Sequence, residues 1–469
     1  MIADLKPYAE YKESGLPWLG QVPGHWGLVP NRGLIRRRKL LVGKHHGAYR
    51  LLSLTKQGVI VRDISTGKGK FSSDMGTSQE VRNGDLVFCL FDVPETPRTV
   101  GLSRHDGMIT GAYSVFESLG RGSSEYFELF YRAMDDRKLL SPLYSGLRNT
   151  IQAERLLGTK TPQPPPDEQA AIVQFLDWAN GRLERAIRAK RKVIALLNEQ
   201  KQAIIHRAVT RGLDPSVRLK PSGIPWLGDI PKLWTAPRVK QCAWKISKGT
   251  TPSTEGREIL EYGPVRFLKA ENISAGLITD KPLYFIDEVT NHMIRRSQLK
   301  ENDILFVIAG ATLGKTAVVS AEHLPANTNQ AVAFIRPNSV VVPSFLELWL
   351  QSPRIKELIW LNAVQSAQPN LSMADLGNFA IPVPPRDEQE QILNFVKSAT
   401  KPMSDAISRL EREIDLLREY RMRLVADVVT GKLDVRQAAA CLPDEPQHGA
   451  DNDDMEAIDD IDVADEEAV

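Results

Sequence analysis

The sequence predicts a mixed α+β or α/β protein in which two similar globular domains are separated by two long helices that form an antiparallel coiled coil. Three observations support this prediction. A helix-like segment that begins at Asp167 recurs at Asp387, 220 positions later, without a gap. A Pro- and Trp-rich motif occurs twice, at residues 14–26 and 222–234. Each copy of this Pro-Trp motif precedes a long segment of short strand-like runs and turns. The chain is therefore a pseudo-twofold tandem repeat.

The repeated helical segment carries one narrow apolar stripe in each copy. Prolines precede Asp167 and Asp387, and acids in the first turn favour a helix N-terminus. Apolar residues then recur at alternating steps of four and three, the pattern of a coiled-coil seam. We predict that the two stripes pair with each other, and packing of each stripe on its own domain is the alternative. The seam residues are Leu183, Ile187, Ile194, Leu197 and Ile204 in the first copy and Ile407, Leu410, Ile414, Leu417 and Leu424 in the second.

A separate, longer helix is expected to begin inside each copy. Asn180 and Thr400 occupy equivalent positions, and both residue types can cap a helix N-terminus. Lys201 and Arg421 are also equivalent, and they interrupt the apolar stripes with long side chains whose stems can lie along apolar surface. Antiparallel pairing of the helices would keep these two like charges apart.

The repeat divides the chain into seven parts. They are a leader with the first Pro-Trp motif (1–26), the first domain (27–163), the central helical region (164–212), a linker with the second motif (213–234), the second domain (235–384), the C-terminal helical region (385–432) and an acidic tail (433–469). We expect an irregular backbone in both Pro-Trp motifs because prolines and glycines interrupt them. Their tryptophans are predicted to pack on a domain surface: Trp18, Trp26, Trp226 and Trp234.

Apolar runs bounded by turn residues predict the strands of both domains. Strands are expected at residues 49–54, 58–61 and 85–91 in the first domain and at residues 265–268, 303–308 and 331–335 in the second. One helix is expected in each domain, at residues 125–140 and 344–361. Because the elements recur in the same order, we predict two domains of one fold with different surfaces.

The net charge of +2 conceals an uneven distribution of charge. Residues 443–469 hold twelve acidic side chains and no Lys or Arg, which leaves 46 acidic residues against all 60 basic ones in the body. A basic body suits a polyanionic partner, and the acidic segment is predicted to be disordered. No apolar run is long enough for a membrane span, and three distant cysteines favour a reducing, cytoplasmic setting.

Catalytic motifs are poorly matched. The stretch Gly310 to Thr316 resembles a phosphate-binding loop, but it has three residues between its glycines where that loop needs four. His45 and His46 are adjacent, which is a poor geometry for sharing one metal ion. We therefore predict a chain without catalytic activity, metal or cofactor.

Basic side chains and polar loops favour binding. Basic groups hold phosphates, whereas base edges are read by Arg, Asn, Gln, Ser or Thr on loops that reach a groove. Two such loops, residues 146–150 and 367–372, occupy equivalent places in the two domains, although each alone could be a solvated loop. The candidates from these patterns are Arg36, Arg37, Lys44, Arg148 and Asn149 in the first domain and Lys248, Gln368 and Asn370 in the second.

The whole arrangement resembles the specificity subunit of type I restriction-modification enzymes. The sharpest local matches are the Pro-Pro-Arg-Asp-Glu-Gln run that begins at Pro384, the turn Lys248-Gly-Thr-Thr-Pro252 and the run Asn329-Gln-Ala-Val-Ala. In that family each variable segment is a target recognition domain with its DNA contacts in loops. The resemblance therefore adds Thr250, Thr251 and Gln330 as DNA-binding candidates and supports Lys248, Gln368 and Asn370.

The resemblance also implies partners. They are double-stranded DNA, two methyltransferase subunits that carry S-adenosylmethionine, and motor-nuclease restriction subunits. Two alternatives stay open: a specificity chain that serves a fused single-polypeptide restriction-methylation enzyme, and a coiled-coil scaffold that does not bind DNA. The first domain departs from the family pattern, because Asp92 to Arg98 follows its strand where the second domain has the short turn Gly310 to Gly314.

Overall fold

The computed structural model describes residues 5–16, 18–62, 75–274, 276–363 and 370–443. The chain forms two compact units, Met1–Ala189 with Glu413–Val469, and Lys190–Arg412. Each unit therefore holds one globular domain and one part of each long helix. The sequence predicted a linear series of domains. In the structure they form two units, and the first unit is assembled from both ends of the chain. None of the described helices combines the length and apolarity needed to cross a membrane.

A four-stranded antiparallel sheet forms the centre of the first domain, in the order β4-β11-β8-β9. The strands are β4 (Ile35–Arg38), β11 (Ser114–Ser118), β8 (Leu86–Phe88) and β9 (Val100–Leu102). Five hairpins or strand pairs flank it: β1 (Tyr11–Glu13) with β2 (Gln21–Pro23), β3 (Gly27–Pro30) with β14 (Lys160–Gln163), β5 (Leu52–Thr55) with β6 (Gly58–Val61), β7 (Gln79–Val81) with β10 (Gly107–Ile109), and β12 (Tyr144–Ser145) with β13 (Thr150–Ile151).

Alternation along the strands separates two faces of this sheet. Leu86, Phe88 and Phe116 pack with helix α1 (Ser124–Asp136) and the long helices in the main core of the unit. Val87 and Val115 face the opposite way, into a smaller core that the β5–β6 and β7–β10 hairpins complete. The short helix α2 (Ala153–Gly158) follows β13.

The second domain repeats the sheet in the order β17-β25-β22-β23. Its strands are β17 (Ala243–Lys248), β25 (Val332–Pro337), β22 (Ile304–Val307) and β23 (Thr316–Val318). A further sheet joins β21 (Phe285–Ile286), β18 (Val265–Leu268) and β24 (Ala326–Thr328), and two short pairs join β15 (Leu219–Pro221) with β16 (Asp229–Pro231) and β19 (Ile273–Ser274) with β20 (Leu277–Ile278). The helices are α4 (Glu288–Met293), α5 (Pro343–Leu350), α6 (Pro353–Ala363) and α7 (Met373–Asn378). The prediction of one fold used twice is therefore correct for the central sheet.

The single helix predicted at residues 344–361 is wrong, because α5 and α6 are separate helices. Pro353 starts α6, and a proline has no N–H to continue the hydrogen-bond ladder of a preceding helix. The backbone N–H of Ser352 instead donates to Trp349 O at 3.0 Å, which closes the last turn after α5.

Each repeated helical segment is one continuous helix. Helix α3 runs over Pro166–Arg211 and helix α8 over Arg386–Val429. The predicted caps at Asn180 and Thr400 are wrong, since both residues lie in helix interiors. The Thr400 hydroxyl donates to Val396 O at 2.7 Å, one turn earlier, which satisfies it within the helix.

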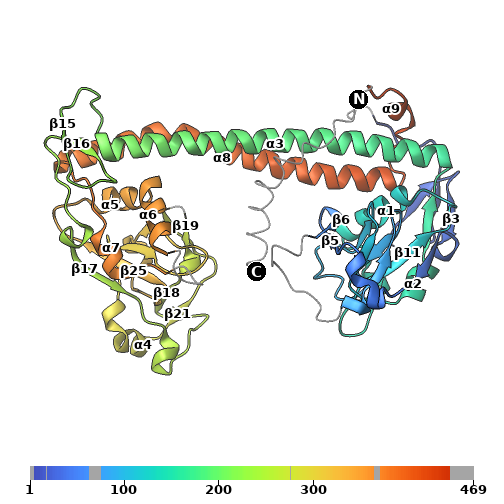
Figure 1. Cartoon of the computed structure of the whole chain (residues 1–469), viewed down its shortest axis with the longest axis horizontal. Coiled ribbons are helices and arrows are strands. Elements are labelled where there is room, and N and C mark those ends of the chain that lie inside the picture. Colours follow the sequence, from blue (N-terminus) through green and yellow to red (C-terminus); the bar gives the residue numbers. More distant parts are fainter. Residues whose placement is uncertain (1–4, 17, 63–74, 275, 364–369, 444–469) are drawn as a thin grey trace. The chain divides into compact units, whose positions relative to one another are not determined.

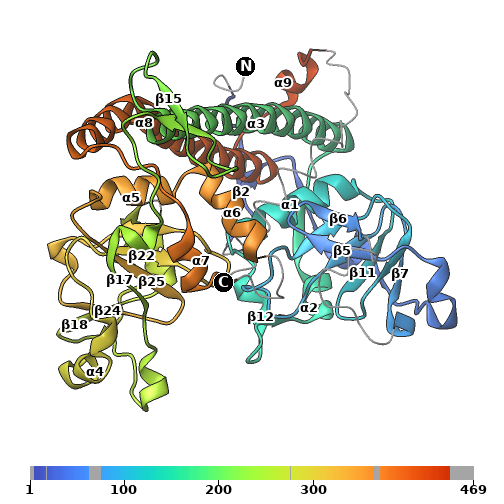
Figure 2. The same ribbon diagram turned by 60° about the vertical axis from the view of Figure 1, so that its left-hand side comes forward.

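The predicted antiparallel pairing of the helices is confirmed in both units, where α3 and α8 lie side by side (Figures 1 and 2). In the first unit, Arg421 Nη1 donates to Glu184 Oε2 at 2.9 Å, and in the second, Lys201 Nζ donates to Ser404 Oγ at 3.0 Å. The seam residues Leu183, Ile187, Ile414 and Leu424 are buried, and the other predicted seam residues are half-buried: Ile194, Leu197, Ile204, Ile407, Leu410 and Leu417. Their helical neighbours Leu196 and Leu416 are exposed.

The Pro-Trp motifs are more regular than predicted. Each folds as a short hairpin, β1–β2 or β15–β16, closed by equivalent bonds from Ser14 N to Gly20 O and from Ser222 N to Gly228 O. Trp26 is fully buried in the first unit. The predicted packing role of the tryptophans is correct, since Trp234 is also buried and Trp18 and Trp226 pack against the cores.

The acidic tail starts later than the predicted residue 433. Helix α9 (Arg436–Ala440) follows α8, and its N-cap residue Val435 and its own residue Ala439 are buried in the core of the first unit. Asp434 N also donates to Lys6 O at 2.8 Å, which ties this segment to the start of the chain. Apolar side chains thus extend the folded unit to about residue 442, and residues 444–469 lie outside the described residues.

Candidate nucleic-acid interface

The candidate loops of the second domain follow from the direction of its strands. Strands β17 and β22 both pair antiparallel with β25, so the ends of β17 and β22 and the start of β25 lie at one edge of the sheet. Three loops lie at this edge. Two of them begin at Gly249 and at Ala309, and the third ends just before Val332. We call this edge the loop edge of the domain.

Two of these loops are pressed together. Gly249 N donates to Val332 O at 3.0 Å, and Thr250 N donates to Thr328 O at 2.9 Å. A Cβ at Gly249 would lie only 2.1 Å from the carbonyl oxygen of Thr328, so only glycine permits this approach. The structure therefore brings the predicted residues Lys248, Thr250 and Thr251 next to the loop of Gln330.

Asn370 lies at the same edge. It forms a β-bridge with Ala309, directly after β22, and the next residue, Leu371, donates its N–H to Ile308 O at 2.9 Å. The side chain of Asn370 is exposed. Gln368, the other candidate from this loop, lies outside the described residues.

Arg148 and Asn149 occupy the matching edge of the first domain. Ile151 N donates to Leu90 O at 2.8 Å, and Asp92 N donates to Arg148 O at 3.0 Å, so the β12–β13 hairpin sits beside the end of β8. This repeats the contact between Leu371 and Ile308. Asn370 and the β12–β13 hairpin thus lie beside the ends of equivalent strands in the two domains.

The other basic candidates of the first domain lie elsewhere. Arg36 and Arg37 are within β4, before its end, and Lys44 is exposed in the 3-10 segment Gly43–Ala48. Arg36 Nε donates to Glu117 Oε1 at 2.6 Å, so its charge is partly neutralised although the side chain is 70% exposed. The structure does not bring these three residues to the loop at Arg148, and their DNA contact stays a prediction.

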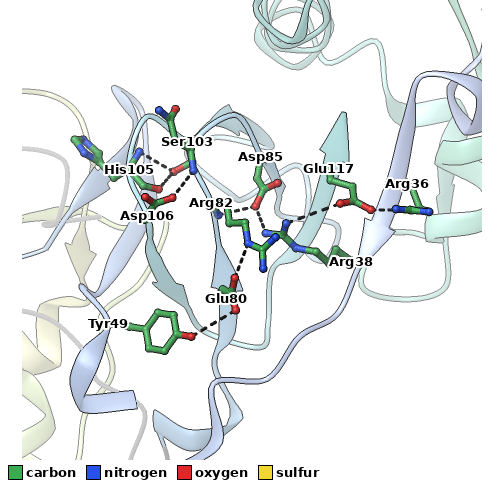
Figure 3. A network of polar contacts seen from close by, with 11 residues as sticks. Arg36, Arg38, Tyr49, Glu80, Arg82, Asp85, Ser103, His105, Asp106 and Glu117 are labelled. Carbon is green, nitrogen blue, oxygen red and sulfur yellow. Dashed lines mark hydrogen bonds and ion pairs between the residues drawn. The ribbon is translucent and has the colours of Figure 1, made fainter. Parts of the chain in front are cut away.

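Figure 3 shows that Arg36 belongs to a network of alternating charges across this sheet. Arg38 reaches both Glu117, at 3.9 Å, and the buried Asp85. The Asp85 carboxylate also accepts from Arg82 N at 2.6 Å. Burial raises the pKa of Asp85, while this backbone hydrogen bond and the Arg38 guanidinium oppose that rise. The network continues through Arg82 to Glu80 and Tyr49.

The repeated Asp-Glu-Gln motif at the helix starts has a role that the sequence did not reveal. Glu168 is buried and accepts hydrogen bonds from Tyr8 Oη at 2.5 Å and from Trp26 Nε1 at 2.9 Å, and it contacts His25 Nε2 at 2.8 Å. Glu388 makes the equivalent bond with Trp234 Nε1 at 3.0 Å. These carboxylates fasten each Pro-Trp motif to a long helix.

The glutamine that follows each of these glutamates binds the N-terminus of a helix in the adjoining domain. Gln169 Oε1 accepts from Ser123 N at 2.8 Å, and Ser123 is the N-cap residue of α1. Gln389 Oε1 accepts from Val342 N at 2.7 Å, and Val342 is the N-cap residue of α5. The recurrence of a Glu-Gln pair 220 positions apart was the available signal, but its partners lie too far away in sequence to be predicted.

The arrangement of reactive side chains does not suggest chemistry. Burial raises the pKa of Cys89 and of Cys242 to about 11, so both thiols stay protonated at neutral pH. Within the part of the chain that the structure describes, no group of three or more His, Cys, Asp or Glu side chains could hold a metal ion.

Two α+β domains share one central sheet order and are each joined to the paired long helices, so the chain is an internally duplicated protein. Residues 231–416 match the family model described as type I restriction modification DNA specificity domain, so this part of the chain is similar to that domain. The relatives agree. The chain is 25% identical over 318 residues to the EcoBI specificity subunit of Escherichia coli, covering 62% of this chain and 65% of that protein.

Further relatives have the same description. The chain is 25% identical over 281 residues to the MjaVIII specificity subunit of Methanocaldococcus jannaschii, covering 59% of this chain and 63% of that protein. The matches thus span just under two thirds of these curated relatives. A solved chain from a study of complex assembly and conformational transition of a type I system has a TM-score of 0.61 at 14% identity, over 88% of this chain and 99% of that one. That likeness supports the fold.

Proposed function

We propose that this chain is the DNA sequence-recognition and scaffold subunit of a type I restriction-modification complex and has no chemistry of its own. The observation that carries this proposal is the repetition of the loop edge. The polar residues Arg148 and Asn370 lie at equivalent edges of the equivalent central sheets of the two domains. Such groups read base edges when they are presented on loops that reach a groove.

We further propose that the target is bipartite and asymmetric, with one half-site for each domain. The support is the difference between the loop edges. Strand β8 is followed by the Asp92 to Arg98 loop, whereas β22 is followed by the shorter turn from Gly310 to Gly314. Different loops present different donors and acceptors, so the two half-sites should differ in sequence.

The scaffold role is supported by the repeated fastening of the helices. Glu168 with Trp26 and Glu388 with Trp234 produce two similar local surfaces in one chain. Similar surfaces attract similar partners, so we propose that two copies of one methyltransferase subunit bind, together with restriction subunits. S-adenosylmethionine would be held by the methyltransferase subunits, and this chain would hold no cofactor. Native mass spectrometry that showed saturation at one methyltransferase per chain would contradict the stoichiometry.

Mapping of methylated bases tests the central proposal. DNA exposed to the assembled complex should carry methyl groups at one bipartite, non-palindromic sequence with an unread gap. Exchanging the segment 235–384 for the corresponding segment of another specificity chain should change one half-site and leave the other unchanged. The full chain should bind duplex DNA more tightly than a chain that lacks both domains. Equal affinities would favour the alternative that the chain is a scaffold for proteins alone.

A further inference from the structure

A hairpin at the loop edge of the first domain is bound along its β13 side to the residues that follow β8. Strands β12 and β13 pair Tyr144 with Ile151 and Ser145 with Thr150. The Ser145 hydroxyl donates to Thr150 O at 2.9 Å. The bonds of Leu90 and Asp92 to this hairpin, described above, fix it to the end of the central sheet. Its tip is therefore a built projection rather than a loose loop.

The tip presents an aliphatic side chain to solvent. Leu147 has a relative exposure of 105%, the largest among the exposed large apolar residues that the structure describes. Gly146 at φ +70° and Asn149 at φ +43° form the turn, which a bond from Asn149 N to Gly146 O closes at 3.3 Å. The left-handed conformation at these positions turns the chain sharply, so Leu147 stands at the apex.

The neighbours of Leu147 indicate what it contacts. Arg148 follows it directly and is exposed, as is Asn149. Single exposed leucines are common on protein surfaces. Here, however, the leucine stands between a glycine and an arginine on a fastened hairpin, in a body with 60 basic and 46 acidic residues before residue 443. Apolar side chains with basic neighbours enter DNA grooves and separate stacked base pairs, and this kinks the duplex.

We propose that Leu147 acts as a wedge that enters between two base pairs of the half-site read by the first domain, with Arg148 and Asn149 at the adjacent backbone and base edges. This inference rests on the proposed function and adds a mechanism to it. Recognition in this half-site would then depend partly on how easily a base-pair step unstacks. Pyrimidine–purine steps unstack most easily, so one such step is expected beneath the hairpin.

The test uses the full-length chain and a duplex that carries the target found by methylation mapping. The fluorescent base 2-aminopurine is placed in turn at each position of both half-sites. With the unchanged chain, the fluorescence of 2-aminopurine at one position of one half-site should increase on binding, because unstacking relieves the quenching by neighbouring bases. The variant Leu147→Ala should abolish this brightening and lower affinity about tenfold, since unstacking and the bent state are no longer stabilised. Leu147→Met, which keeps an apolar tip, should retain both.

Two comparisons make the test specific. Leu277→Ala removes a leucine that is 69% exposed in the second domain, and it should leave affinity and fluorescence unchanged. The dependence of affinity on salt should be the same for Leu147→Ala and the unchanged chain, because no phosphate contact is lost. Equal fluorescence and affinity in Leu147→Ala and the unchanged chain would overturn the wedge and leave DNA recognition intact. Absence of specific binding by the unchanged chain would instead refute the proposed function.

Discussion

A buried aspartate precedes the equivalent strand in each domain, and the two domains neutralise it from different strands. Asp85 is paired with Arg38 of β4, whereas Asp303 is held by both Nε and Nη2 of Arg336 on β25, at 2.8 and 2.7 Å. Glu117 occupies the position in the first sheet that Arg336 occupies in the second. The sheet therefore requires a counter-charge for this aspartate but not a particular strand to supply it.

The fastening of the long helices differs in the same way. Glu168 holds three side chains in the first unit, while Glu388 holds Trp234 in the second. His25 is replaced by the exposed Leu233 at the equivalent position. The shared tryptophan contact is thus the common element, and the first unit adds polar partners from the start of the chain.

Lengthening both helices should change the target most. Inserting seven residues after Leu197 and seven after Leu417 preserves the heptad phase and adds about 10 Å to each helix. Both half-sites should keep their sequences while the gap grows by up to about three base pairs. Affinity for the original target should fall by at least a hundredfold, because each misplaced base pair costs about 1–3 kcal/mol. Methylation mapping checks this, and an altered half-site with an unchanged gap would show that the helices do not set the spacing.

Removing the buried aspartate of the second domain should cause the largest loss of stability. Asp303→Ala leaves the Arg336 guanidinium without its counter-charge, which typically costs about 3–5 kcal/mol. Urea denaturation of the full chain measures the effect. The matched control is Asp280→Ala, whose ion pair with Arg266 involves an aspartate side chain that is 75% exposed and should contribute under about 1 kcal/mol. Equal losses in the two variants would contradict the importance of the buried pair.

The two fastening glutamates should differ in their contribution to stability. Glu168→Ala leaves the Tyr8 and Trp26 donors without an acceptor in a buried site, so we expect a loss of about 3 kcal/mol. Glu388→Ala disrupts one indole bond at a half-buried position and should cost about 1 kcal/mol. Thermal or urea unfolding of both variants ranks them. A larger loss for Glu388→Ala would reverse the comparison.

The smallest effect concerns two equivalent glutamates in the domain helices. Burial raises the pKa of Glu128 and of Glu347, opposed in Glu128 by Arg132 and in Glu347 by bonds from Thr316 and Gln351. A carboxyl whose folded pKa lies above its unfolded value favours folding most at low pH, and this contribution declines as pH rises through the folded pKa. Glu347→Gln should therefore stabilise the chain by up to about 1 kcal/mol at pH 7 and not at pH 4.

The matched variant Glu128→Gln loses its ion pair with Arg132, at 3.3 Å, and should gain less stability than Glu347→Gln. Unfolding free energies measured from pH 4 to pH 7 distinguish the two. A gain for Glu347→Gln that stayed constant over this range would exclude titration of the carboxyl as its cause.

The sequence by itself determined the repeat, the helix seam and the main strands. Leu183 lies in one apolar stripe with coiled-coil spacing and Ile414 in another, because each helix buries one face. This periodicity is a local signal. Strand β6 was predicted with its observed bounds because a short run of β-branched apolar residues after a glycine is also a local signal. The site loops could be placed only by analogy between the repeats.

Only the tertiary structure decided how distant residues are combined. It paired Glu168 with Trp26 and Asp303 with Arg336, since such contacts depend on how strands and helices meet and leave no periodicity in the chain. It also replaced the predicted caps at Asn180 and Thr400 with continuous helices, because hydrogen bonds and packing along a long helix outweigh a local capping preference. The exposure of Leu147 likewise depends on the hydrogen bonds that fix its hairpin to the distant residues Leu90 and Asp92.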